Sequence, residues 1–169
     1  MLNKDKLQQI YIDSTYIVFK RIDNWIKKDS TRSVGEMVEH HARGKIVEEY
    51  VRQHILDYSP KNKVTKVDYD TKNKALFDAD LILNDQYNIH IKHCSPSMMS
   101  WMFDKNDPVI NMHSTKDVIV LCVFHDMFNI DIRYKLKASP NFPLSEPYKK
   151  GIDKVVIKDE HIKMYKEFE

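Results

Sequence analysis

Two short runs decide the expected fold of this chain, FDADLIL at residues 77–83 and YNIHIKHC at residues 87–94. Each run largely alternates apolar and polar residues, which is the period-two pattern of a half-buried β-strand. The polar residues Asn84, Asp85 and Gln86 between the runs predict a turn. The runs are therefore expected to pair as a hairpin whose buried side is supplied by Leu81, Leu83, Ile89 and Ile91.

Four polar residues of this hairpin carry the expected chemistry. Residues two apart in a strand share a face, so Asp78 projects with Asp80, and His90 projects with Lys92. Pairing of the strands would bring two carboxylates, an imidazole and an ammonium group together. Such a cluster suits phosphodiester hydrolysis, because carboxylates hold a divalent cation that polarises the phosphate while a lysine orients or deprotonates the attacking water.

Hydrophobic periodicity predicts two N-terminal helices before the hairpin. Apolar residues recur at three- and four-residue spacings over residues 5–28, and again from about residue 33 to residue 56. Ser33 and Glu36 form a capping-box pattern at the start of the second helix. The remaining pattern predicts strands at 64–69, 75–83, 87–94, 117–124, 129–136 and 153–157, and helices at 97–103 and 159–168. An α/β fold is expected, with helices first and then a strand meander.

Composition is typical of one globular domain. The chain has 169 residues, of which 42% are hydrophobic and 31% charged, so residues 1–169 are expected to fold as a single domain. Only three glycines occur, at positions 35, 44 and 151. This argues against a Rossmann dinucleotide site or a P-loop, because both need clustered glycines for close approach to phosphate.

Charge and cysteine content constrain partners and compartment. A formal charge of +2 is too small to indicate nucleic-acid binding by itself, and the lysine clusters at 61–74 and 149–166 are interleaved with acidic residues. The apolar surroundings of Cys94 and Cys122 suit free thiols. No signal-peptide pattern and no run of about 20 apolar residues occurs. A soluble cytoplasmic protein without a membrane segment is expected.

The hairpin resembles the PD-(D/E)XK nuclease superfamily. The superfamily signature is an acidic residue opening one strand, a short turn, and (Asp/Glu)-x-Lys on the next strand. Asp80 followed by LIL corresponds to the first element. The tripeptide His90-Ile91-Lys92 corresponds to the second, with a histidine where the family usually has a carboxylate. Neutral imidazole is nevertheless a competent ligand for Mn²⁺, although Mg²⁺ prefers oxygen.

A second part of the resemblance lies upstream, in HARGKIVE at residues 41–48. It looks like the first helix of the superfamily, where a small residue lets the helix approach the sheet and a glutamate often reaches the metal. Glu48 and His41 are seven residues apart, nearly two full turns, so they share a helix face. His40 lies about a quarter-turn away and is the weaker candidate.

The resemblance covers roughly residues 40–135 and implies a restriction-endonuclease-like core, a mixed central sheet flanked by helices. It implies a metal-dependent endonuclease that uses Mg²⁺ or Mn²⁺ and acts on DNA, most readily double-stranded, and a possible homodimer like the smallest type II restriction endonucleases. The implied catalytic residues are Asp80, His90, Lys92 and Glu48. The implied metal ligands are Asp80, His90, Glu48, Asp78 and His41. Lys92 would position or activate the attacking water.

Alternatives to these roles stay open from sequence. His90 could be a hydrogen-bonded structural histidine, Lys92 a strand-edge lysine, and Glu48 a helix partner of Arg52. A degenerate nuclease fold that binds nucleic acid or protein without catalysis would carry the same hairpin. An RNA endonuclease would use the same chemistry on another substrate.

Overall fold

A computed structural model of the chain describes residues 2–23, 32–69, 79–111, 113–145 and 154–164. The helices and strands described are, in chain order, α1 (Lys4–Lys20), α3 (Val34–Tyr58), β1 (Leu81–Leu83), β2 (Tyr87–Cys94), β3 (Ser100–Asp104), α4 (Pro108–Asn111), β4 (Asp117–Asp126), β5 (Asn129–Lys137), β6 (Leu144–Ser145), β7 (Lys154–Lys158) and α5 (Asp159–Met164). No helix in these ranges combines the length and apolarity needed to span a membrane.

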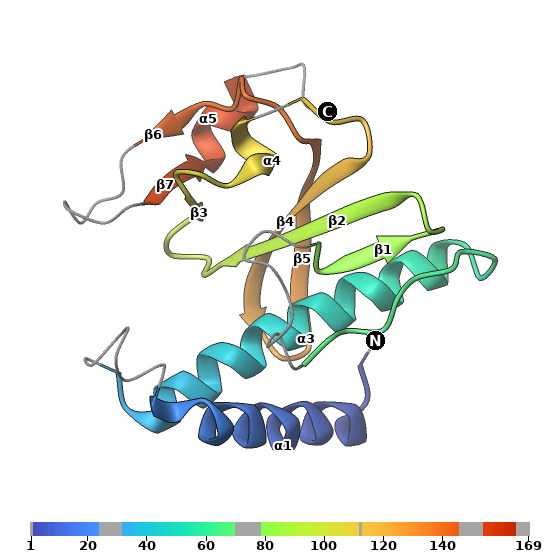
Figure 1. Cartoon of the computed structure of the whole chain (residues 1–169), viewed down its shortest axis with the longest axis vertical. Coiled ribbons are helices and arrows are strands. Elements are labelled where there is room, and N and C mark those ends of the chain that lie inside the picture. Colours follow the sequence, from blue (N-terminus) through green and yellow to red (C-terminus); the bar gives the residue numbers. More distant parts are fainter. Residues whose placement is uncertain (1, 24–31, 70–78, 112, 146–153, 165–169) are drawn as a thin grey trace.

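The strands in the described ranges form two sheets. The central sheet has the order β1-β2-β4-β5 and is mixed: β2 pairs parallel with β4, and the other neighbours pair antiparallel. The second sheet has the order β3-β7-β6 and is antiparallel. The molecule is therefore α/β with a mixed central sheet, as predicted. Figure 1 shows α3 between α1 and the central sheet, and the second sheet with α4 and α5 on the far side.

Helix α3 is placed by its cap and by its apolar stripe. The Ser33 side chain accepts a hydrogen bond from the backbone N–H of Glu36, and the Glu36 carboxylate accepts one from the backbone N–H of Ser33, so the predicted capping box is confirmed. Ala42, Ile46 and Val47 are fully buried in the core between the helices and the sheet. The side chains next to this stripe are therefore held against β2.

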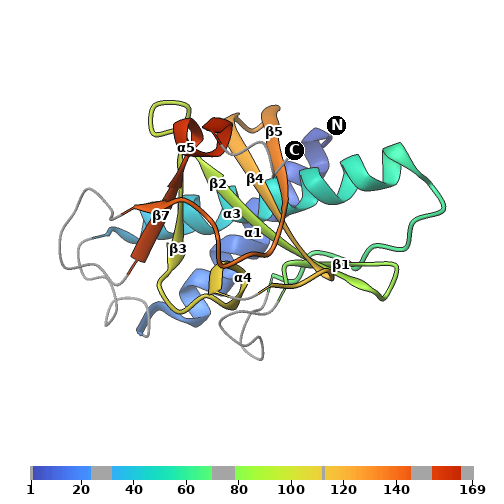
Figure 2. The same cartoon turned by 90° about the horizontal axis from the view of Figure 1, so that it is seen from above.

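Strand β4 shows why the central sheet is buried on both faces. Val120 and Cys122 belong to the core on the helix side, whereas Ile119 and Leu121 belong to the core on the side of the second sheet. Alternate residues of a strand face opposite sides. A continuous apolar run such as β4 is thus expected where both faces are covered. Figure 1 shows α1 and α3 on one side of the central sheet and the second sheet on the other, and Figure 2, seen from above, shows β2 and β4 crossing α3.

Within the described residues, three residues of the hairpin's first strand pair with its second strand, and residues 75–78 of the expected strand lie outside the described ranges. Strand β1 pairs antiparallel with β2 from Leu81 opposite Ile89 to Leu83 opposite Tyr87. Beyond Ile89, the described part of the chain gives β2 the parallel neighbour β4 on one side and no strand on the other. The C-terminal half of β2, which contains Lys92, therefore lies at an edge of the sheet.

Some local predictions are confirmed and others are wrong. Both N-terminal helices and the strands at 87–94, 117–124 and 129–136 are present. The helix expected at 97–103 is wrong, because Ser100–Asp104 is strand β3, paired with β7. The expected meander is also wrong, because β2 and β4 are parallel and the chain crosses between them through β3 and α4. At 64–69 the described residues form an isolated bridge from Val64 to Leu83.

Candidate functional site

Asp80 lies directly before β1 with its carboxylate against β2. Its backbone N–H donates to the carbonyl oxygen of Ile89 at 2.9 Å, and its Oδ2 accepts a hydrogen bond from the backbone N–H of Ile91 at 2.7 Å. The carboxylate therefore binds the β2 backbone where β1 pairing ends. This fixes Asp80 beside the edge of β2 that leads to Lys92. Asp78, its predicted companion, lies outside the described residues.

His90 is held by a carboxylate of the neighbouring strand. Its Nε2 lies 2.9 Å from Oδ1 of Asp117, and the ring is buried. An ionised carboxylate only accepts hydrogen bonds, so the imidazole donates. Burial alone would raise the pKa of Asp117, but hydrogen bonds from Ser114, His90 and Asn88 outweigh burial and lower it. His90 thus has the geometry of the hydrogen-bonded structural histidine.

Glu48 lies on α3 in a buried ion pair. Both of its carboxylate oxygens are 2.8 Å from Nζ of Lys45, and both side chains are buried. The alternative partner, Arg52, instead donates from Nη1 to Glu49 at 3.3 Å. Glu48 is therefore fixed by Lys45 and not by Arg52, the partner expected from the sequence.

His41 faces α1. Its Nδ1 lies 3.0 Å from Oγ of Ser14. Burial, followed by the positive charges of Lys45 and Arg21 and by His40, lowers the pKa of His41 to about 4. His41 is thus a neutral residue of the helix–helix contact at neutral pH.

Lys92 projects toward the second sheet. Its Nζ lies 5.5 Å from the ring centroid of Phe103 and 4.0 Å from Oδ2 of the buried Asp107. A cation over an aromatic face is attracted by the ring quadrupole. Its side chain remains about one third exposed, so the ammonium group is both positioned and accessible.

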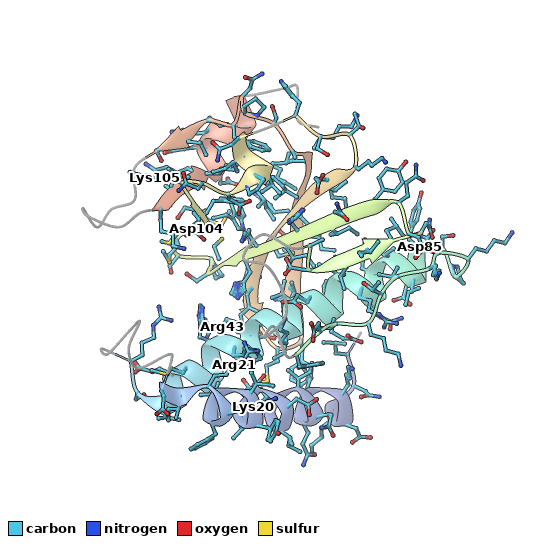
Figure 3. The ribbon with its side chains drawn as sticks, in the orientation of Figure 1. Lys20, Arg21, Arg43, Asp85, Asp104 and Lys105 are labelled. Atoms are coloured by element: carbon cyan, nitrogen blue, oxygen red, sulfur yellow. The ribbon has the colours of Figure 1, made fainter. Side chains whose placement is uncertain are left out.

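A cavity of about 420 Å³ brings some of these residues together. We call it the edge pocket, and its lining consists of Arg32, His40, Gly44, Val47, Glu48, Ile91, Lys92, His93, Met102 and Lys154. Glu48 and Lys92 share it, whereas Asp80, His90 and His41 are not in its wall. Asp80 is connected to it through the backbone N–H of Ile91. In Figure 3, Arg43 on α3 and Asp104 on β3 lie on either side of the end of β2.

The edge pocket contains two histidines, of which the sequence motifs indicated His40 only as the weaker helix candidate and did not indicate His93. The rings of His93 and His40 are 6.4 Å apart between centroids and roughly perpendicular, and Nε2 of His93 is buried without a hydrogen-bond partner in the described residues. Burial, followed by His40 and the charges of Arg43 and Lys92, lowers the pKa of His93 to about 4. Strand alternation could have indicated His93, because residues two apart share a face and His93 therefore lies on the helix-facing side of β2 with Ile91.

The predicted metal ligands do not come together in the described part of the chain. No group of three or more His, Cys, Asp and Glu side chains there has a geometry that could hold a metal ion. His90 is bonded to Asp117, and His41 to Ser14. The described donors therefore do not fit the expected ligand set, and the use of Mg²⁺ or Mn²⁺ stays a prediction.

Comparison of the chain with protein-family models, with curated proteins and with solved structures gives no match. The resemblance to the nuclease superfamily therefore stays a prediction that rests on the hairpin and helix motifs.

Proposed function

We propose that this chain is a nuclease that binds DNA and hydrolyses its phosphodiester bonds at the edge pocket. The observation that carries the proposal is the shared pocket of Glu48 and Lys92. The nuclease pattern expects a glutamate from the first helix and a lysine from the second strand of the hairpin at one site. These two residues come from α3 and β2, so folding, not sequence proximity, brings them to one cavity.

The charges of the pocket also support phosphate as ligand. Arg32 and Lys154 line it together with Lys92, and Lys154 is held by an ion pair with Asp104 on β3. Cations placed in a partly enclosed site stabilise the negative charge that develops on a phosphoryl group during hydrolysis. In the proposal Lys92 binds a phosphate oxygen or orients the attacking water.

The restriction-endonuclease-like core belongs to the same proposal. It is supported by the order of the described elements, in which α3 packs on the sheet, β1 and β2 form an antiparallel hairpin, and β2 pairs parallel with β4. A divalent cation would polarise the phosphate in such an enzyme. In the described residues, however, the carboxylate and imidazole donors do not gather around a common point.

The test is cleavage of plasmid DNA, with Mg²⁺ and with Mn²⁺, by the wild type and by Lys92→Met, Glu48→Gln and Asp80→Asn. We expect Lys92→Met to lose about 10²-fold in rate or more, as is usual when a group that stabilises transition-state charge is removed. Glu48→Gln and Asp80→Asn should also cut more slowly, because each removes a carboxylate that would hold the divalent cation. Lys137→Met on β5 and Asp57→Asn on α3 are matched controls, since both positions are exposed and outside the pocket. Equal cutting by all six proteins would contradict the assignment. An RNA oligonucleotide assayed in parallel tests the alternative substrate.

A second candidate is a nuclease-like fold that binds nucleic acid without cutting it. It is favoured by the His90–Asp117 hydrogen bond, which holds the residue at the usual carboxylate position away from the edge pocket. Titration calorimetry separates the two functions. An enzyme is expected to bind Mn²⁺ with an affinity that Asp80→Asn lowers. A binding module is expected to show DNA affinity that falls steeply with salt and does not depend on metal.

A further inference from the structure

We infer that His93, and not His90, is the imidazole that contacts the bound phosphodiester, with its Nε2 donating a hydrogen bond to a phosphate oxygen. The inference rests on the proposed function, since it names a ligand contact of the same pocket. His93 lines the edge pocket next to Lys92, whereas His90 is engaged by Asp117. Neither the superfamily pattern nor the predicted ligand set includes His93.

The buried Nε2 atom of His93 is the first argument. It has no hydrogen-bond partner in the described residues, although buried polar atoms of native proteins nearly always have one. The ring lies beside the rings of His40 and Phe124, with centroids 6.4 Å and 6.2 Å away, and a rotation of the side chain would turn Nε2 toward the pocket that His93 lines. A ligand in the pocket would supply the missing partner.

The second argument concerns which nitrogen of the His93 imidazole carries the proton when such a ligand is bound. A phosphodiester oxygen accepts hydrogen bonds and has no proton to donate, so Nε2 of a neutral imidazole must carry the proton. The imidazole is neutral at neutral pH, because burial and the nearby groups His40, Arg43 and Lys92 lower the pKa of His93 to about 4. A neutral ring can still donate, and the hydrogen bond is charge-assisted by the anionic acceptor.

The charged groups around the ring give the third argument. On the side of α3 they are His40 and Arg43, both of which lower the pKa of His93, and Glu48, which lines the pocket and is paired with Lys45. Lys92 comes from β2. Lys154 of β7, paired with Asp104 of β3, and Arg32 complete the lining charges. An anionic ligand offsets these cations, so its binding raises the pKa of His93 and favours proton uptake.

The experiment is binding of a fluorescent DNA oligonucleotide, single-stranded and duplex, in EDTA so that no cutting occurs. We expect His93→Leu to weaken binding about tenfold, the equivalent of one hydrogen bond to a charged group. His93→Gln, whose amide N–H₂ reaches the place of Nε2, should retain most of the affinity. His125→Leu, at an exposed position of β4, is the matched control and should bind like the wild type.

A second measurement keeps the inference testable if His93→Leu fails to fold. In ¹⁵N-labelled wild type, the NMR titration of the His93 imidazole is followed with and without saturating oligonucleotide or inorganic phosphate. An increase of the His93 pKa, with the resonances of His90 unmoved, is the expected result. An unchanged His93 in DNA-bound protein would overturn the inference and leave the nuclease proposal standing. A His93 that responds to phosphate in a protein that never cuts DNA would support the inference and contradict the nuclease.

Discussion

Two histidines, His41 on α3 and His93 on β2, make the stability of this fold depend on pH. His41 and His93 both have a pKa lowered from 6.5 to about 4, chiefly by burial. Between these values the unfolded chain binds protons that the folded chain does not, so the free energy of unfolding falls as pH decreases from about 6.5 to about 4. Above a pH of about 6.5, the pKa of these histidines in the unfolded chain, their contribution to the free energy of unfolding is fully present.

Urea unfolding at about pH 7 and about pH 5 tests this dependence. His41→Asn should show a smaller loss of stability between the two pH values than the wild type, because one of the two partly buried imidazoles no longer titrates. His125→Asn, at an exposed site, should keep the wild-type difference. The same difference in His41→Asn as in the wild type would show that burial of His41 does not determine the acid sensitivity.

Substitutions in the Lys45–Glu48 pair distinguish its contribution to stability from the role of Glu48 in DNA cleavage. Both side chains are buried, and removal of one member of a buried pair leaves an uncompensated charge that destabilises by about 3–5 kcal/mol. We expect Lys45→Met to lower the free energy of unfolding by that order, measured with urea at neutral pH. The double variant Lys45→Met/Glu48→Leu should recover most of the loss while cutting no DNA. A double variant as unstable as Lys45→Met would contradict this.

At the scale of elements, Trp101 connects the second sheet to the central one. Its indole N–H donates to the carbonyl oxygen of Cys122 on β4 at 2.8 Å, and the side chain is fully buried. Trp101→Phe removes this donor and leaves a carbonyl and a small cavity unfilled, so we expect a loss of about 1–3 kcal/mol. Met102→Leu on the same strand, at a half-exposed position, should change stability little. Equal effects of the two substitutions would contradict the role of Trp101.

Local patterns predicted the elements whose determinants lie within a few residues. The capping box at Ser33 and the strand from Tyr87 to Cys94 are of this kind, and both are confirmed, although burial along the strand does not alternate strictly. Strand β3 could not be predicted, because Ser100–Asp104 owes its extended form to pairing with β7, about 50 residues away. Local propensity is overridden by such tertiary pairing. The parallel β2–β4 register depends in the same way on a distant crossover.

The residues of the candidate site divide in the same way, into those that a local motif predicted and those that depend on the tertiary fold. Glu48 and Lys92 were selected from sequence because each belongs to a local motif, and the fold gives them a common pocket. His93 was missed, because its partner His40 lies on another element and the contact depends on how α3 crosses the sheet. The engagement of His90 by Asp117 also depends on the register of β4.

At the scale of the whole molecule, the nuclease proposal concerns one pocket shared by a helix, an edge strand and the second sheet. A homodimer acting on double-stranded DNA stays a prediction, which sedimentation of the protein with and without a duplex oligonucleotide checks. The lysine-rich segments would bind phosphates in that complex, so affinity should fall steeply as salt increases.

The most direct test of the central claim is a double-mutant cycle on the rate of plasmid cleavage, with Glu48→Gln, Lys92→Met and the variant that combines them. Residues that act as one catalytic unit show strongly non-additive losses. If Glu48 and Lys92 work in one pocket, the combined variant should be about as slow as the slower single variant. Two losses that multiply, or wild-type cutting in all three variants, would contradict the assignment of a nuclease site to the edge pocket.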